Sequence, residues 1–376
     1  MKNYLLVNLL NLLSFLFFMV EESLLEVMKD TASYFGRSGV IDYVEDIGKK
    51  FNGKRNETHL IEIGMVRRFP FVWKRFVEDF SKEQVLFQIE ISDALKKEGI
   101  LTPVFYGRND WKRIYERDGR NIVLQQYLPS EQIQDASLEQ CVSAVEMHGR
   151  FMKALEGKEF EYAQYAPSRK GIVAAREELT RLLDAELIEG TGTSREEEKR
   201  IKGDEIPRLL NLSNELKQYD SEEGVSMIHG DFQWKNIGYV GGKAEIIYDF
   251  DQVRLDLPSA DLAHTIDMFT IKRQEKDYDP NAPTGAFRFS PYEVNYEKAE
   301  ALVNILRDKG IFSDEEIAKM PESLAIWTLN GLAMHYHYGM EVPTMGHKKL
   351  SREFMLQTRL NACLNNEKFR GIFKDA

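Results

Sequence analysis

The segment MIHGDFQWKNIGYV, residues 227–240, contains the residue types that phosphoryl transfer requires. His229, Asp231 and Asn236 stand in the order H-x-D-x-x-x-x-N, and Asp249 ends the apolar run EIIYD farther along the chain. A carboxylate can orient an attacking hydroxyl, and carboxylate and amide oxygens are ligands of Mg²⁺. Any one of these acids could instead cap a turn or a helix. Their joint occurrence favours a phosphoryl-transfer loop over a polar turn.

Two regions of different pattern must position these residues. Residues 51–128 predict two strands, a helix and then three strands, because β-rich and alternating segments surround one helical period. Ser81 is the expected N-cap of that helix, and Gly99 is its expected C-terminal stop. Residues 21–50 predict one or two amphipathic helices. The N-terminal region is therefore expected to be a small α+β lobe.

From about residue 129 the pattern is mainly helical, with short β segments around the HGD loop and a turn at the glycine pair 241–242. The prediction is an α+β protein with a small β-rich N-lobe and a larger, mainly helical C-lobe. The expected domains are an apolar extension over 1–20, an N-lobe over 21–128 and a C-lobe over 129–376. In the C-lobe we expect helices at 137–156, 168–188 and 205–219, an exposed loop or frayed helix at 189–205, and a loop at 274–292.

Composition indicates a soluble globular protein. Of the 376 residues, 43% are hydrophobic and 30% are charged, which is enough apolar material for a large core. The net charge of −11 argues against a nucleic-acid binder, because such proteins usually present a basic face. Cys141 and Cys363 belong to no Cys/His cluster, so free thiols in a reducing compartment are expected rather than a zinc site. We therefore expect a cytoplasmic protein.

The N-terminal run YLLVNLLNLLSFLFFMV, residues 4–20, is nearly all apolar. A signal peptide, a membrane anchor, a helix packed on the protein and a start site placed too early could each account for it. Only Lys2 precedes the run and no A-x-A cleavage pattern follows it. Asn8 and Asn11 interrupt it, whereas a spanning helix needs about 20 apolar residues. A start at Met19 or a packed helix is favoured over an anchor.

HGDFQWKN at 229–236 and IIYDFDQVRLDLPSADLA at 246–263 form a pair of motifs. They resemble the HGDxxxxN loop and the following acidic segment of the aminoglycoside phosphotransferase and choline kinase-like family. The likeness extends over residues 40–340, and the spore-coat-associated, CotS-like branch is similar. The resemblance implies a bilobal protein-kinase-like fold that uses ATP and Mg²⁺.

The resemblance also implies roles for the polar residues of both motifs. Asp231 would be the catalytic base, or the residue that orients the acceptor hydroxyl. Asn236 and Asp249 would hold Mg²⁺. The residues that would support the loop rather than react are His229, Asp251 and Asp261.

Weaker signals place ATP in the N-lobe. The segment GKRNETHLIEI resembles the family's phosphate-covering hairpin, in which Gly53, Asn56 and Thr58 fit the pattern, and the chain has no GxxxxGK[ST] P-loop. Lys74 follows a predicted strand and alternates with Val72, so its side chain is expected to point into the lobe. The resemblance implies that this lysine contacts the phosphates of ATP.

In the family, that lysine pairs with a glutamate of the following helix, and here the sequence departs from the pattern. The expected position falls near Gln88, whereas Glu83 and Glu90 are the acids at hand and Glu90 is the nearer. A shifted helix register, a glutamine partner or a lost pair all remain open. Backbone groups near Gln126 and Leu128 are expected to meet the adenine edge.

The sequence therefore predicts an ATP- and Mg²⁺-dependent phosphotransferase that acts on a hydroxyl of a small molecule, without a nucleic-acid or membrane partner. The alternative is a non-catalytic kinase-like protein with a structural or assembly role, for example in a spore coat. The doubtful helix glutamate and the apolar N-terminus favour that alternative. His148 and His264 lie in helical patterns and are expected to be structural. Neither the acceptor nor the oligomeric state follows from the sequence.

Overall fold

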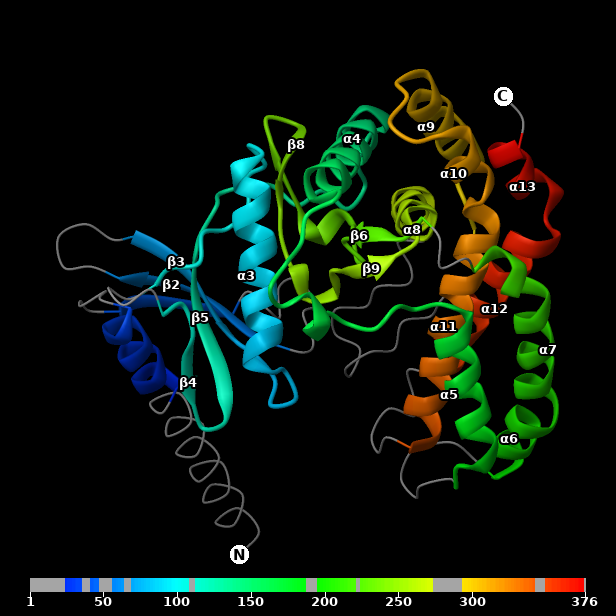
Figure 1. The fold of residues 1–376 in the computed structure, drawn as a ribbon, viewed down its shortest axis with the longest axis horizontal. Coiled ribbons are helices and arrows are strands. Elements are labelled where there is room, and N and C mark those ends of the chain that lie inside the picture. Colours follow the sequence, from blue (N-terminus) through cyan, green and yellow to red (C-terminus); the bar gives the residue numbers. More distant parts are fainter. Residues whose placement is uncertain are drawn as a thin grey trace, which may run out of the picture. The chain divides into compact units, whose positions relative to one another are not determined.

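The computed structural model describes residues 24–35, 41–46, 56–63, 69–107, 112–186, 195–220, 224–272, 293–341 and 349–374. The chain divides into two compact units (Figure 1). The first comprises Met1–Lys97, Leu101–Pro129 and Phe160–Tyr165, and the second comprises Glu98–Ile100, Ser130–Glu159 and Ala166–Ala376. The apolar run at 4–20, Gly53 and the expected loop at 274–292 lie outside the described residues.

The first unit is built on a five-stranded antiparallel sheet with the order β1-β2-β3-β5-β4 (Figure 1). Asp118 and Gly119 join β4 to β5 with φ values of 52° and 70°, the left-handed conformation that a two-residue hairpin turn needs. The strands are β1 (Ile41–Asp46), β2 (Glu57–Ile63), β3 (Phe69–Arg75), β4 (Tyr115–Arg117) and β5 (Arg120–Gln126).

Helices cover both faces of this sheet. On one face, α3 (Lys82–Lys97) packs Val85 and Ile89 against Phe76 and Val123. Neighbouring strand residues point to opposite faces, so the residues on either side of Val123 face the other way. There they form a second buried cluster with a helix at 24–34. The second cluster includes Val27, Met28, Phe35, Ile61, Phe71, Trp73, Ile122 and Leu124.

The ends of α3 follow the sequence expectation. Ser81 Oγ accepts a hydrogen bond of 3.2 Å from the Gln84 amide, and Gln84 Oε1 accepts one of 2.8 Å from the Ser81 amide. This reciprocal pair is a capping box, which satisfies two amides that a helix start leaves open. Gly99 has a φ of 74°, the left-handed conformation that often ends a helix. Both predicted helix signals are confirmed.

Two expectations for the first unit are wrong. Residues 41–46 fall in the stretch expected to be helical, but they form β1 and pair with β2. Ile41 is buried and Val44 is exposed, as expected of a strand at a sheet edge with one face solvated. The first of the three strands predicted after α3 is reduced to an isolated bridge between Phe105 and Gln125. Pro103 precedes it and has no N–H to donate to a ladder.

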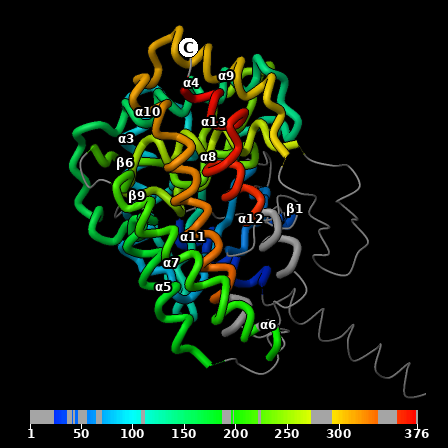
Figure 2. Tube along the Cα trace, turned by 90° about the vertical axis from the view of Figure 1, so that its right-hand side faces the viewer, coloured from blue at the N-terminus to red at the C-terminus, as the bar shows by residue number. Residues whose placement is uncertain are grey.

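The second unit is mainly helical. Its longest helix, α11 (Met320–Glu341), is flanked by α5 (Ile172–Asp184), α7 (Ile206–Leu216), α8 (Pro258–Thr270) and α12 (Lys349–Asn365) (Figure 2). Within the described ranges, no helix combines the length and the apolar character needed to cross a bilayer. This unit also contains the helices α4 (Leu138–Leu155), α9 (Tyr296–Asp308), α10 (Asp314–Ala318) and α13 (Glu367–Lys374).

Two short β-pairs carry the polar motifs of this unit. β6 (Ser226–Ile228) pairs with β9 (Arg254–Asp256), and β7 (Ile237–Val240) pairs with β8 (Lys243–Ile247). The turn between β7 and β8 has φ values of 58° and 81° at its two glycines, as predicted for 241–242. The HGD motif directly follows β6, so these strands fix where the motif begins.

The stretch expected to be an exposed loop or a frayed helix at 189–205 is helical in its described part. α6 (Arg195–Arg200) continues through a π-helical turn (Ile201–Glu205) into α7. Ile201 is fully buried although its neighbours in the sequence are polar. One buried apolar side chain thus anchors a segment whose composition alone indicates solvent exposure.

Candidate active site

A fully buried carboxylate holds the start of the HGD loop. Asp261, in the first turn of α8, accepts hydrogen bonds from the backbone amides of His229 (2.9 Å) and Gly230 (3.0 Å). Its Oδ2 also lies 2.7 Å from Nε2 of His148 on α4. Burial opposes ionisation, but His148, with smaller contributions from His229 and Arg254, holds the pKa of Asp261 below its usual range. The carboxylate therefore stays charged and ties α4, α8 and the loop together.

His229 braces the same loop from inside the core. Its Nε2 donates to the backbone oxygen of Tyr248 at 3.1 Å, and its Nδ1 accepts the Asp231 amide at 3.3 Å. Burial lowers the pKa of this fully buried ring, so the neutral form is favoured. A neutral ring can make both hydrogen bonds, which gives His229 a positioning role.

Asp231 is partly exposed to solvent, with 27% of its side chain accessible. Its Oδ1 accepts from the Gln233 side chain, and its Oδ2 accepts from Asn236 Nδ2 at 2.9 Å. Two cationic or potentially cationic groups flank it: Lys235 Nζ at 3.9 Å and His264 Nε2 at 3.8 Å. Burial raises its pKa, yet His264 and Lys235 outweigh this and hold the pKa below the usual range. Asp231 is thus an ionised acceptor at neutral pH.

Asn236 is buried and oriented by Asp231. Its Nδ2 donates to the backbone oxygen of Asp231 at 2.8 Å as well as to the carboxylate. With the amide nitrogen engaged in this way, the amide oxygen is the atom that can face a cation. The Asn236 backbone oxygen also accepts the Tyr248 amide at 2.9 Å. That hydrogen bond connects the loop to the residue preceding Asp249.

Asp249 has a backbone conformation that L-residues seldom adopt. Its φ and ψ are 59° and 77°, directly before the short 3₁₀ turn Phe250–Gln252. Such left-handed residues tend to cluster at functional sites. The Asp249 charge raises the pKa of Asp231, so the two carboxylates are electrostatically coupled. Asp251, the other predicted support residue of this segment, is half-buried within the turn.

The donor set of this loop fits Mg²⁺ bound together with phosphate oxygens. Among the described residues, no group of three or more His, Cys, Asp and Glu side chains could hold a metal by itself. Asn236 and Asp249 instead offer one amide oxygen and one carboxylate. Mg²⁺ is commonly bound through one or two carboxylates, with the remaining positions filled by substrate phosphates and water.

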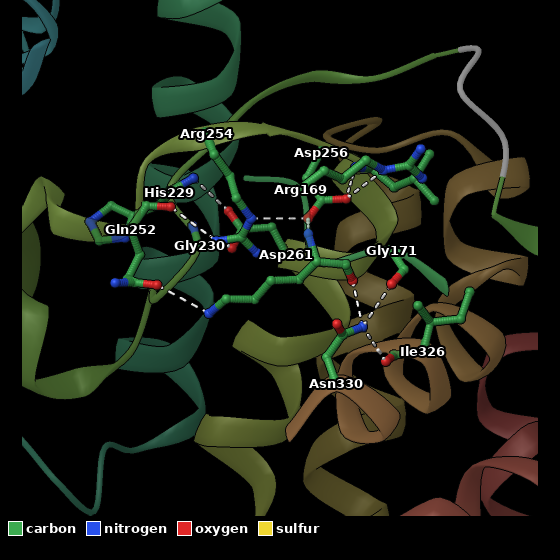
Figure 3. A network of polar contacts seen from close by, with 12 residues as sticks. Arg169, Gly171, His229, Gly230, Gln252, Arg254, Asp256, Asp261, Ile326 and Asn330 are labelled. Atoms are coloured by element: carbon green, nitrogen blue, oxygen red, sulfur yellow. Dashed lines mark hydrogen bonds and ion pairs between the residues drawn. The ribbon is translucent and has the colours of Figure 1, made fainter. Parts of the chain in front are cut away.

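A second polar network lies beside the HGD loop (Figure 3). Arg254 is fully buried, and its Nε donates to Asp256 Oδ2 at 3.0 Å. Arg169 Nε donates to Asp256 Oδ1 at 3.1 Å and also forms an ion pair with Asp220. Asn330 of α11 donates to the backbone oxygen of Lys170 at 2.7 Å. The segment before α5 is therefore tied both to β9 and to α11.

Gly230 is required where this network meets the loop. Its φ is 76°, and a Cβ at this position would lie 2.3 Å from both Arg254 Nη1 and the Gln252 backbone oxygen. The sequence does not single out Arg169, Arg254 or Asp256. The pattern R-x-D on a buried strand is a signal that could have found the last two, because residues two apart share one face.

The first unit contains the predicted nucleotide-contacting residues of the N-lobe. Lys74 on β3 is 8% exposed and lies opposite Thr58 in the β2–β3 register. Its register partner on β5 is Val123, which belongs to the cluster with α3, so Lys74 points toward that helix. Asn56 Oδ1 accepts the Val77 amide at 3.2 Å, which closes the end of the β2–β3 pair.

The remaining predicted residues of this unit lie on α3 and at the end of β5. The Glu90 carboxylate accepts the amides of Glu161 (3.3 Å) and Tyr162 (3.1 Å). Gln88 is 3% exposed, and its Nε2 has no hydrogen-bond partner in the described part of the chain. The backbone amide of Gln126 donates a hydrogen bond of 2.8 Å to the backbone oxygen of Val104. Leu128, two residues beyond β5, is half-buried.

The model of the phosphotransferase enzyme family matches residues 52–284, which is more than half of the chain. The chain belongs to the phosphotransferase enzyme family. The matched range includes both motifs that suggested the aminoglycoside phosphotransferase and choline kinase-like family, so that resemblance is confirmed. A search among curated proteins found no match.

Solved kinase and phosphotransferase structures are similar in fold at low sequence identity. An amicoumacin kinase in complex with AMP-PNP and Ca²⁺ is 15% identical, with 82% of this chain and 85% of that chain covered and a TM-score of 0.56. A choline kinase from Cryptosporidium parvum is 14% identical, with 94% and 97% covered and a TM-score of 0.54. A spectinomycin phosphotransferase in complex with ADP is 11% identical, with 94% and 97% covered and a TM-score of 0.53. The predicted kinase-like α+β fold is thereby confirmed.

Proposed function

We propose that the protein is an ATP- and Mg²⁺-dependent phosphotransferase that moves the γ-phosphate to a hydroxyl of a small molecule. The observation that carries this proposal is the loop of the second unit. An ionised, partly exposed Asp231 accepts a hydrogen bond from Asn236, and Asp249 sits in a left-handed conformation within its electrostatic reach. Family membership supports the reaction class.

Each loop residue then has a defined task. Asp231 would accept a hydrogen bond from the acceptor hydroxyl, orient its oxygen for in-line attack and take up the proton. Asn236 and Asp249 would hold Mg²⁺, which when bound neutralises charge on the phosphates. Asp261 and His229 would keep the loop in place, as their hydrogen bonds to its backbone indicate. Asp251 would support the turn after Asp249.

For the first unit, the proposed function is that of an ATP-binding lobe. Lys74 is the candidate contact for the α- and β-phosphates, and its near-complete burial suits a lysine held in one orientation. Thr58, its register partner, and Asn56 belong to the proposed phosphate-covering hairpin together with Gly53. Backbone groups at Gln126 and Leu128 would meet the adenine.

Glu90 favours a second candidate function. Its carboxylate, the acid that the sequence offers as a partner for Lys74, accepts the amides of Glu161 and Tyr162. A kinase-like protein in which this acid has a structural role could bind nucleotide without turnover and serve in an assembly. Turnover separates the two candidates.

The test of the proposed function is phosphoryl transfer from MgATP to a panel of hydroxyl acceptors, comprising sugars, amino alcohols and aminoglycosides. We expect transfer to at least one acceptor class by the unmodified protein. Asp231→Asn should lower kcat by about 10²–10⁴-fold, because a general base contributes about that much, while MgATP binding is retained. Wild-type turnover in that variant would overturn the role of Asp231. Absence of turnover with every acceptor and with water would favour the non-catalytic candidate.

A further inference from the structure

His264 lies beside the proposed base although the sequence gives it only a structural role. It sits on α8, one turn after Asp261, and its Nε2 is 3.8 Å from Asp231 Oδ1. That distance is too long for a direct hydrogen bond. A single oxygen atom placed about 2.8 Å from each of the two atoms would bridge them with ordinary hydrogen-bond lengths.

The imidazole of His264 is buried. The residue is 8% exposed, and in the part of the chain that the structure describes neither ring nitrogen has a hydrogen-bond partner. An unsatisfied buried polar group of this kind destabilises a folded protein. By contrast, His148 and His229 of the same region each have a hydrogen-bonded ring nitrogen. His264 Nε2, which lies beside Asp231 without a hydrogen bond, therefore points to a ligand atom between the two side chains.

The ring is held in a fixed plane. It stacks on Trp327 of α11, with ring centroids 4.7 Å apart and an interplanar angle of 16°. The Arg254 guanidinium lies 5.0 Å and the Lys170 ammonium 5.5 Å from the Trp327 ring, so that ring is itself packed against charged groups. Stacking controls the plane of the imidazole but satisfies neither nitrogen.

We propose that Asp231 Oδ1 and His264 Nε2 together seat the acceptor hydroxyl. This inference rests on the proposed phosphotransferase function. The hydroxyl donates its proton to Asp231, while His264 Nε2–H donates a hydrogen bond to the hydroxyl oxygen. Two contacts fix the direction of the oxygen lone pair, whereas Asp231 alone leaves the hydroxyl free to rotate.

The transfer step balances with these two residues. The hydroxyl oxygen forms a bond to the γ-phosphorus, and the bond from that phosphorus to the β,γ-bridging oxygen breaks. ADP leaves with the electron pair of the broken bond, and the hydroxyl proton passes to Asp231 Oδ1. His264 keeps its own proton throughout and acts by orienting the reacting oxygen. It is a catalytic residue in the sense that it touches a reacting atom.

Two variants of His264 separate hydrogen bonding from packing. His264→Phe preserves an aromatic ring on Trp327 and removes both nitrogens. His264→Gln places an amide N–H₂ within reach of the Nε2 position and removes the ring. If His264 served only to stack on Trp327, the phenylalanine variant would be the better tolerated of the two.

The experiment measures MgATP hydrolysis by the full chain with water as the hydroxyl acceptor, alongside MgATP binding by thermal shift. We expect His264→Phe to lower kcat about 100-fold, the order of effect that misplacement of a reacting group can have, with unchanged MgATP affinity. His264→Gln should recover most of the rate. A wild-type rate in the phenylalanine variant, or a greater loss in glutamine than in phenylalanine, would overturn the inference while leaving the proposed function intact. An unmodified protein that binds no MgATP would instead overturn the proposed function.

Discussion

Asp261 holds the HGD loop in place through hydrogen bonds to two loop amides and to His148, although it would not touch a substrate. It is fully buried, and its two oxygens accept two loop amides and the His148 ring. A buried charge is tolerated only when such partners satisfy it. The loop position of Asp231 therefore depends on a residue that takes no part in the proposed chemistry.

We predict that Asp261→Asn lowers the free energy of unfolding at pH 7 by about 3 kcal/mol, because the buried His148 and the loop amides lose their charged acceptor. The pKa of Asp261 is lower in the folded state than its usual value. Its contribution to stability is therefore complete above the unfolded pKa of about 3.9 and declines as the pH falls below it. Urea unfolding of both proteins from pH 7 to pH 3 checks this. A stability difference that does not shrink in acid would contradict it.

Gly230 allows a second test at the scale of one residue. Gly230→Ala should destabilise the protein through a left-handed backbone and through contact with Arg254 and the Gln252 carbonyl at 2.3 Å. Gly241→Ala is the matched control, because its φ is also positive but a Cβ there meets nothing within 4 Å. The control should cost about 1–2 kcal/mol from backbone strain. Gly230→Ala should cost about 1–3 kcal/mol more, and equal losses in urea unfolding would argue against the steric account.

At the scale of elements, the strands and helices that bear motifs follow from local sequence, whereas several others do not. The capping box at Ser81 and the hairpin turn at Asp118–Gly119 depend on residues adjacent in the chain. β1 depends on pairing with β2, which no local pattern encodes strongly in a short edge strand. The helical segment at 195–205 contains the fully buried Ile201, whose burial its polar sequence neighbours do not reveal.

Some residues of the candidate site could likewise be predicted from the sequence, and others could not. Asp231, Asn236 and Asp249 lie in a recognisable spacing, and His229 and Asp261 accompany them. The contact between His264 and Asp231 and the ion pair between Arg169 and Asp256 each join side chains from separate elements. Such contacts form only in the folded chain, so the sequence does not predict them. Which acid, if any, pairs with Lys74 also remains a prediction, because the structure places Glu90 on the 161–162 amides.

Arg169 tests how firmly the segment before α5 is tied to β9. Its guanidinium pairs with Asp220 and Asp256, which are 6% and 4% exposed. Arg169→Leu leaves two buried carboxylates without this partner and should lower the free energy of unfolding by about 3–5 kcal/mol. Lys319→Gln, which removes an exposed ion pair with Glu315, should cost less than about 1 kcal/mol. Comparable losses in the two variants would show that the buried pairs do not stabilise the fold.

At the scale of the whole molecule, the chain combines a sheet-rich unit that carries Lys74 with a helical unit that carries the acidic loop. The family and the fold place it among phosphotransferases. The function proposed for this member of the family requires that the chain bind and use MgATP. In the proposal, Asp249 supplies the carboxylate ligand of Mg²⁺, so this residue gives the proposal its most direct test.

The most direct measurement is a thermal shift with ATP, with and without Mg²⁺, for the unmodified chain and for Asp249→Asn. Asparagine also tolerates the left-handed backbone at φ 59°, so the variant should fold. A ligand that binds only the folded state stabilises it by about 2.7 kcal/mol at a concentration 100 times its Kd. We predict a Mg²⁺-dependent rise in Tm that Asp249→Asn abolishes. No rise at millimolar MgATP, or the same rise in both proteins, would contradict the account.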